Sequence, residues 1–208
     1  CSCGIIRNRK HYFSVKGVKC IRPLSIGFQY KYKYNCILLD ILKSENKTDS
    51  DEYHKQLIYA FNDAVDTGEY NYALSIAADV EKLIPQYSKS PDEDLYYFFG
   101  SLQEVAGRVR DYNTGIDCTN KRLALLPKLA NGDTLSYNNV DNYIMLSQLY
   151  YEAGMEDKAQ MAIELAEREC ASIKNMPDLE VKELFACLYQ AKGRVSDSYD
   201  VSQREFNA

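Results

Sequence analysis

The chain has 208 residues, of which 46% are hydrophobic and 26% charged, a size and composition typical of a globular protein that buries its own core. It contains only 10 glycines and 5 prolines, which argues against a turn-rich all-β fold and against a disordered chain. Residues 1–39 carry a charge of +8 and no acidic side chain, so the net charge of −5 leaves −13 on the other residues. An acidic body disfavours nucleic-acid binding, which depends on Lys and Arg beside phosphates.

Residues 1–44 are predicted to form a basic N-terminal arm. Residues 27–34 alternate as a strand does, whereas residues 36–43 are typical of the first turns of a helix. The pattern leaves three interpretations open: a weakly ordered arm, a targeting segment, or an ordered extension that packs on the rest of the chain. We expect deletion of residues 1–39 to leave thermal unfolding almost unchanged.

Residues 45–208 are predicted to be a helical repeat domain, because apolar side chains recur at three- and four-residue spacing from residue 51 onward. Ser90 and Pro91, followed by Glu93, predict a helix start with a capping box. Residues 127–136 are predicted to be an irregular loop between repeats. The predicted helix pairs are 51–67 with 70–85, 91–109 with 111–126, 138–153 with 156–174, and 177–192 with 194–206.

Glycines and prolines divide these helices at regular places. We expect Gly68, Gly154 and Gly193 just past a helix end, where a left-handed conformation closes a tight turn. Pro85 and Pro127 are expected to stop the second helix of their pairs. A small residue early in each second helix lets two helix backbones approach closely, and the residues at this position are Ala73, Gly115, Ala159 and Ser198.

This spacing resembles that of the tetratricopeptide repeat family over about residues 51–206. The family's repeat is about 34 residues long, whereas positions 68, 110, 154 and 193 of this chain lie 42, 44 and 39 residues apart, so the repeats are degenerate. The resemblance implies an all-α fold, an α-solenoid of about four antiparallel helix pairs in a right-handed superhelix. The clearest unit carries the family pattern at Tyr143, Leu146, Ser147, Tyr150, Gly154, Ala159, Ile163 and Ala166.

The residues needed for catalysis are scarce. His11 lies in the arm and His54 at the start of the first predicted helix, so no histidine pair has the spacing of a zinc site. The sequence also lacks a glycine-rich phosphate loop and a nucleophile elbow. We therefore expect no enzymatic activity, no cofactor and no bound metal.

Seven cysteines occur at positions 1, 3, 20, 36, 118, 170 and 187, without a C-x-x-C pair. Cys118, Cys170 and Cys187 fall in helical patterns and are expected to be small buried side chains. The odd number favours a reducing compartment, and we expect the protein to be cytoplasmic. Cys1 in place of an initial Met is interpreted as processing or as a fragment, which leaves a lipid anchor on Cys1 or import into an organelle as alternatives.

In the tetratricopeptide frame, the first helix of each pair lines the concave face, where such solenoids bind their partners. Tyr97, Ile144 and Tyr151 suit a peptide with apolar anchors and some positive charge. Glu104 stands where family members that bind a terminal carboxylate carry a polar or basic side chain, so an anionic peptide end is not expected as the ligand. The resemblance places the candidate groove at Asn62, Tyr97, Glu104, Arg108, Asp141, Ile144, Gln148 and Tyr151.

The sequence therefore predicts a non-enzymatic scaffold that binds another protein or a peptide segment, with no membrane-spanning segment and no nucleic-acid site on the acidic body. The alternative function is a sensing domain, which binds a small ligand or a signalling peptide within the superhelix of a larger regulator. The oligomeric state and the partner are not predicted.

Overall fold

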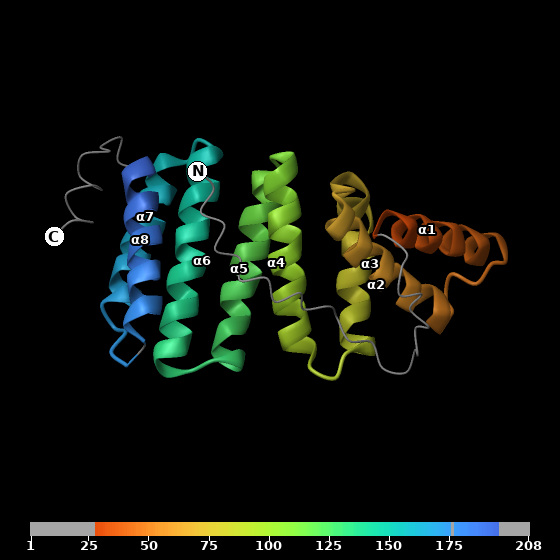
Figure 1. The fold of residues 1–208 in the computed structure, drawn as a ribbon, viewed down its shortest axis with the longest axis horizontal. Coiled ribbons are helices and arrows are strands. Elements are labelled where there is room, and N and C mark those ends of the chain that lie inside the picture. Colours follow the sequence, from red (N-terminus) through yellow and green to blue (C-terminus); the bar gives the residue numbers. More distant parts are fainter. Residues whose placement is uncertain (1–27, 176, 196–208) are drawn as a thin grey trace. The chain divides into compact units, whose positions relative to one another are not determined.

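The computed structural model describes residues 28–175 and 177–195, which form helices and no strand (Figure 1). The all-α prediction is confirmed. The helices are α1 (Phe28–Ser44), α2 (Asp51–Thr67), α3 (Tyr70–Tyr87), α4 (Pro91–Val109), α5 (Tyr112–Leu129), α6 (Gly132–Glu152), α7 (Glu156–Cys170) and α8 (Asp178–Val195).

The described residues divide into two compact units. The N-terminal unit comprises residues 28–110, in which α1 packs on α2, α2 on α3, and α3 on α4. The C-terminal unit comprises residues 111–175 and 177–195, in which α5 packs on α6, α6 on α7, and α8 on both α6 and α7. Within each unit, helices that follow one another in the chain are neighbours in space, as the solenoid prediction requires.

Several helix ends follow the sequence signals. The Ser50 hydroxyl accepts a hydrogen bond from the Tyr53 amide at 3.2 Å and so caps α2, with Asp51 and Glu52 in the first turn. Gly68 ends α2 with φ of 82°, a left-handed conformation that glycine adopts without strain. Gly154 has φ of 72° in the turn after α6, also as predicted.

Other ends differ from the predictions. The Ser90 side chain does not cap α4; the Ser88 hydroxyl instead donates to Asp94 at 2.5 Å and accepts from the Ser90 amide at 2.9 Å. Pro127 lies inside α5, which continues to Leu129, so the predicted loop over residues 127–136 is wrong. A proline disturbs only the bond to the carbonyl four residues earlier, and here the last turn still closes through the Ala130 amide and the Leu126 carbonyl at 2.9 Å.

Two further glycine and proline predictions also change. Pro85 lies inside α3, which runs to Tyr87. Gly193 lies within α8, so the predicted turn at this position is wrong. The predicted last helix, 194–206, and the small residue Ser198 lie almost entirely outside the described residues.

The core of the N-terminal unit contains an aromatic contact between α2 and α4. Phe61 of α2 and Phe98 of α4 are fully buried, and their ring centroids lie 4.9 Å apart. Ala73 of α3 is also fully buried, as the prediction of a small residue in the second helix requires. Burial of each phenylalanine contributes about 1.5–3 kcal/mol to stability relative to exposure.

Residues 28–44 form a helix rather than the strand that residues 27–34 suggest. α1 buries Leu39 and Leu42, which are 1% and 3% exposed, and it packs on α2 (Figure 1). Asn35 donates a hydrogen bond to Asp63 of α2 at 2.5 Å. This part of the predicted arm is therefore an ordered extension, while residues 1–27 lie outside the described part of the chain.

In the C-terminal unit, α6 is the central helix and its core is aliphatic. Gly115 of α5 is buried, and a Cβ atom added there would meet Leu149 of α6 at 3.0 Å. Gly115 therefore lets α5 and Leu149 of α6 approach closely. The cluster that joins α6, α7 and α8 consists of Val140, Ile144, Ile163, Ala166, Cys170, Leu184, Leu188 and Ala191.

A similar polar contact recurs in both units. In the N-terminal unit, the Tyr87 hydroxyl at the end of α3 donates to Asp51 at 2.8 Å and lies 3.0 Å from His54 Nδ1, both in the first turn of α2. In the C-terminal unit, the Asn175 amide donates to Asp133 at 2.7 Å, at the start of α6. In each case the first turn of one helix is joined to the chain at the end of the next helix.

Candidate functional site

The groove residues predicted in the N-terminal unit lie on α2 and α4. Tyr97, Glu104 and Arg108 are seven and four residues apart and so share one face of α4. Glu104 and Arg108 are exposed and pair with each other at 3.4 Å, an ion pair worth about 0.3–0.5 kcal/mol. Asn62 of α2 is half-buried. The charges of this face therefore largely balance each other.

Tyr97 lies in an aromatic pair at the N-terminal half of α4. Its ring and that of Tyr96 are 5.7 Å apart in an edge-to-face arrangement, and both residues are half-buried. The two residues that follow, Phe98 and Phe99, are buried. Tyr97 is thus held at the edge of a packed aromatic core, with part of its ring accessible.

In the C-terminal unit, the predicted residues lie along α6, but one of them is not accessible. Asp141 is exposed, and Gln148 and Tyr151 are half-buried. Ile144 is only 5% exposed and belongs to the apolar cluster with Leu184 and Leu188 of α8. This burial corrects the prediction for Ile144: α8 packs on α6 at this position, so a contact from a neighbouring helix replaces the expected contact with a ligand.

Asp141 lies next to Arg122 of α5. Desolvation by the surrounding protein raises the pKa of the Asp141 carboxyl, and the positive charge of Arg122 lowers it. Water nevertheless reaches this side chain, which is exposed, and direct solvation stabilises the carboxylate. Exposure to water and the charge of Arg122 therefore both oppose the upward shift of the Asp141 pKa.

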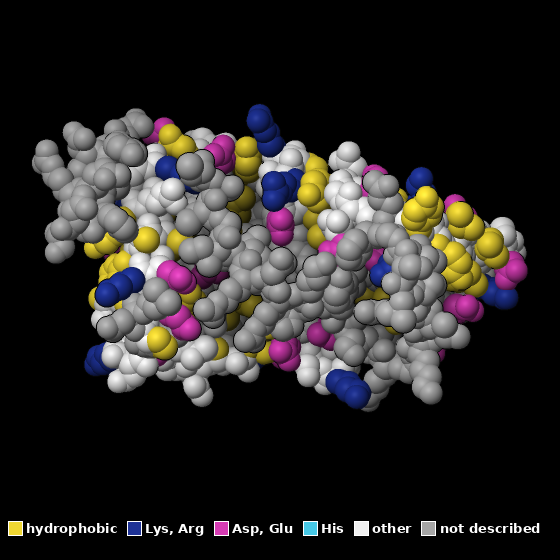
Figure 2. All heavy atoms as spheres, in the orientation of Figure 1, with side chains coloured by type: hydrophobic (Ala, Val, Ile, Leu, Met, Phe, Trp, Pro, Cys, Tyr) yellow, Lys and Arg dark blue, Asp and Glu magenta, His cyan; other side chains and the backbone are white. Residues whose placement is uncertain are grey.

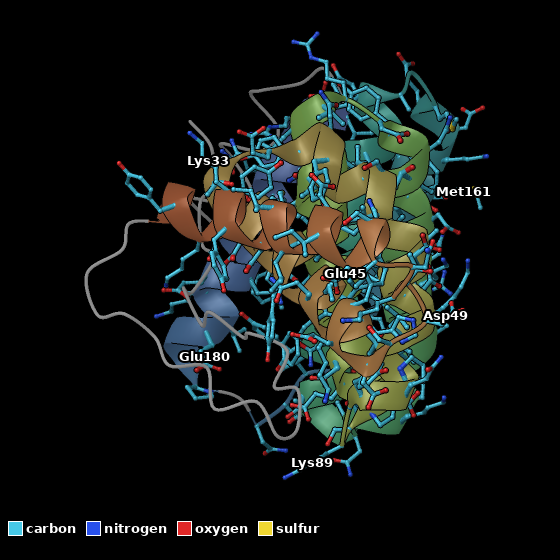
Figure 3. The ribbon with its side chains drawn as sticks, turned by 90° about the vertical axis from the view of Figure 1, so that its right-hand side faces the viewer. Lys33, Glu45, Asp49, Lys89, Met161 and Glu180 are labelled. Atoms are coloured by element: carbon cyan, nitrogen blue, oxygen red, sulfur yellow. The ribbon has the colours of Figure 1, made fainter. Side chains whose placement is uncertain are left out.

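Two acidic residues of α8, Glu180 and Glu183, lie near Tyr137 of α6. One turn before Asp141, the pKa of Tyr137 is raised by burial and then by the negative charges of Asp141, Glu180 and Glu183. Glu180 is labelled on α8 in Figure 3. Sequence reasoning missed both glutamates, because their proximity to α6 depends on the packing of α8. We call Asp141, Glu180 and Glu183 the α6–α8 acidic cluster.

The described part of the chain contains no group of three His, Cys, Asp or Glu side chains placed to hold a metal ion. Cys118 and Cys170 are buried, as predicted, whereas Cys187 is half-buried. Cys1, Cys3, Cys20 and His11 lie outside the described residues. No helix in residues 28–175 and 177–195 combines the length and the apolarity needed to cross a bilayer.

The structure thus divides the predicted residues between the two units. Asn62, Tyr97, Glu104 and Arg108 belong to the N-terminal unit, and Asp141, Gln148 and Tyr151 to the C-terminal unit. In comparisons with known proteins, no protein-family model matches the chain and no curated protein matches it.

Proposed function

We propose that this chain is a non-enzymatic, protein-binding scaffold of tetratricopeptide-like repeats, and that the accessible face of α6 binds a basic peptide segment. The observation that carries the proposal is the α6–α8 acidic cluster, in which exposed Asp141 of α6 and Glu180 and Glu183 of α8 each lie close enough to Tyr137 to raise its pKa. Tyr151 lies ten residues along α6 from Asp141, about 15 Å further along the axis and about a quarter turn around the helix.

The two features have separate roles in binding. Carboxylates that face one surface attract Lys and Arg side chains, increase the rate of association and select against acidic partners. A half-buried tyrosine supplies a rigid apolar contact with a polar hydroxyl, and such residues contribute a large share of binding energy at protein interfaces. We propose that the peptide places a basic residue at the acidic cluster and an apolar side chain against Tyr151.

The test is selection of binders from a displayed library of random peptides, followed by calorimetry with the enriched sequences. We expect enrichment of Lys or Arg together with one large apolar residue. Tyr151→Ala is expected to weaken binding by about tenfold or more, and Asp141→Asn by up to about fivefold, because a solvated charge pair is worth at most about 1 kcal/mol.

The control for Asp141→Asn is Asp157→Asn, which removes the same charge at an exposed position of α7. Peptides that lose no affinity in Asp141→Asn, or that lose as much in Asp157→Asn, would rule out the α6 face as the site. Affinity should also fall with added salt, since the attraction is electrostatic.

We also propose a reducing compartment such as the cytoplasm, because the chain has seven cysteines, an odd number, and Cys118 and Cys170 are buried. If the library returns no peptide, the alternative of a ligand-sensing regulatory domain becomes the better hypothesis. A change of unfolding temperature with small metabolites would then be the measurement to pursue.

A further inference from the structure

α1 carries large apolar side chains on two sides. One side, with Leu39 and Leu42, is buried in the N-terminal unit. The other side is exposed to solvent. Among the described residues, four of the six large hydrophobic side chains that remain exposed lie on this one helix, and Figure 2 shows apolar side chains gathered over it. These four, the α1 outer stripe, are Tyr30, Tyr34, Ile37 and Ile41, with 71%, 65%, 59% and 46% of their surface exposed.

The spacing of the stripe indicates how it is covered. Its residues follow one another at intervals of four, three and four, which is the repeat of the seam between two supercoiled helices. A contiguous stripe of this kind, unlike scattered apolar residues, marks an interaction surface. We propose that the α1 outer stripe pairs with the same stripe of a second copy of this chain, the two α1 helices lying antiparallel.

Charge complementarity argues for a second copy and for the antiparallel direction. Lys33 and Asp40 are both exposed and lie seven residues apart, so they flank the stripe on the same side of α1. A two-fold axis between residues 35 and 36 pairs Tyr34 with Ile37 and Tyr30 with Ile41 of the other copy. The same axis brings each Lys33 to within about 3 Å, measured along the helix axis, of the other copy's Asp40, because each residue advances a helix by about 1.5 Å.

A parallel arrangement lacks this match. It would place the basic N-terminal turns of the two helices, with Lys31 and Lys33, side by side, and it would align the two helix dipoles. One pair of helices of 17 residues is smaller than a standard protein interface. The dimer is therefore expected to be reversible, with a dissociation constant of roughly micromolar order. This interface is separate from the peptide site proposed on α6.

The first experiment is sedimentation equilibrium of the full chain from about 1 to about 300 µM, in the presence of reductant so that no intermolecular disulfide contributes. We expect the apparent mass to rise from 23.9 kDa towards twice that value. Ile37→Glu should leave a monomer at all concentrations. The matched control is Met161→Glu, the same kind of change at a residue of α7 that is 62% exposed and is labelled in Figure 3, and it should dimerise as the wild type does.

The second experiment tests the antiparallel register through the charges. Lys33→Asp and Asp40→Lys should each weaken self-association about tenfold, because each replaces two attractive pairs with two repulsive ones. A mixture of the two variants in equal amounts should form a heterodimer of wild-type strength, since every pair is then attractive. The double variant with both changes should also dimerise as the wild type does. Circular dichroism of each variant checks that the fold is retained.

Three outcomes would overturn the proposal. A chain that is monomeric at every concentration has no such interface. A dimer that Ile37→Glu leaves intact uses another surface, and charge variants that fail to rescue each other exclude the antiparallel pairing. A monomer that instead sediments with vesicles of anionic lipid would assign the α1 outer stripe to a membrane surface and not to a second copy.

Discussion

Arg110 occupies a position where most proteins place glycine. It follows α4 with φ of 62°, and its amide bonds to the Gly107 carbonyl at 3.3 Å. Gly68 closes α2 in the same way with φ of 82°. A left-handed backbone costs a residue with a Cβ atom about 1–2 kcal/mol. The left-handed turn after α4 therefore forms at some cost in stability.

We predict that Arg110→Gly increases the free energy of unfolding by about 0.5–1 kcal/mol, because glycine adopts the left-handed conformation without strain but loses more entropy on folding. Gly68→Ala, the reciprocal change, should lower it by about 1–2 kcal/mol. A Cβ atom at residue 68 would meet the Tyr70 ring only at 3.9 Å, without a clash. The expected loss in Gly68→Ala therefore comes from the left-handed backbone conformation alone. Urea denaturation measures both changes; a stability loss in Arg110→Gly would show that the Arg110 side chain makes a stabilising contact.

At the scale of the elements, α5 packs closely on α6 at Gly115, which has no side chain. We predict that Gly115→Val destabilises the protein by about 1–3 kcal/mol, since the new side chain would overlap Leu149. Gly107→Ala is the control: this exposed helical glycine has nothing within 4 Å of its Cβ position, so the change should stabilise by about 0.5–1 kcal/mol. If both variants lost the same free energy of unfolding, contact with Leu149 would not be the cause of the loss in Gly115→Val.

Tyr32 of α1 and Tyr72 of α3 are in contact, with their ring centroids 5.6 Å apart. Burial and a hydrogen bond with the Cys36 thiol raise the pKa of Tyr32 to about 12. Burial, followed by the charge and hydrogen bond of Cys36, raises the pKa of Tyr72 as well. Because both phenols resist ionisation in the folded state, the unfolded chain loses their protons first as the pH rises.

This order of ionisation predicts a loss of stability in alkali. Tyr32 and Tyr72 contribute fully to the free energy of unfolding below the unfolded tyrosine pKa of about 10. This contribution falls progressively as the pH rises from about 10 towards 12. Tyr72→Phe should make stability less dependent on pH in this window, as measured by urea denaturation at each pH. A slope that Tyr72→Phe does not alter would contradict the argument.

At the scale of the whole molecule, α1 is the part of the predicted arm that packs on the helices that follow it. We predict that deletion of residues 1–44 lowers the unfolding temperature by several degrees, because it removes the buried Leu39 and Leu42, each worth about 1.5–3 kcal/mol. This differs from the expectation of almost no effect on deletion of residues 1–39. Deletion of residues 1–27 alone is the matched control, since it retains α1, and it should cost much less. Equal melting of the two truncated chains would show that α1 does not stabilise the domain.

The sequence by itself determined the helical class and most helix boundaries of this protein, because those depend on local chemistry. Apolar spacing located α2, α3, α4 and α7, and Gly68 and Gly154 marked turns that need a left-handed backbone. Proline was a poorer guide to the ends of α3 and α5, since its effect on a last turn is small enough for other bonds to offset.

Only the tertiary structure decided which of the predicted site residues are accessible. Asp141 and Ile144 are three residues apart on α6, and the sequence predicts both to face the groove. The packing of α8 nevertheless buries Ile144 and leaves Asp141 exposed. The same packing brings Glu180 and Glu183 close to α6, and that of α1 on α2 leaves one apolar side of α1 in solvent. Accessibility and charge clustering depend on which helix covers which face, and contacts between residues distant in the chain leave no mark in local spacing.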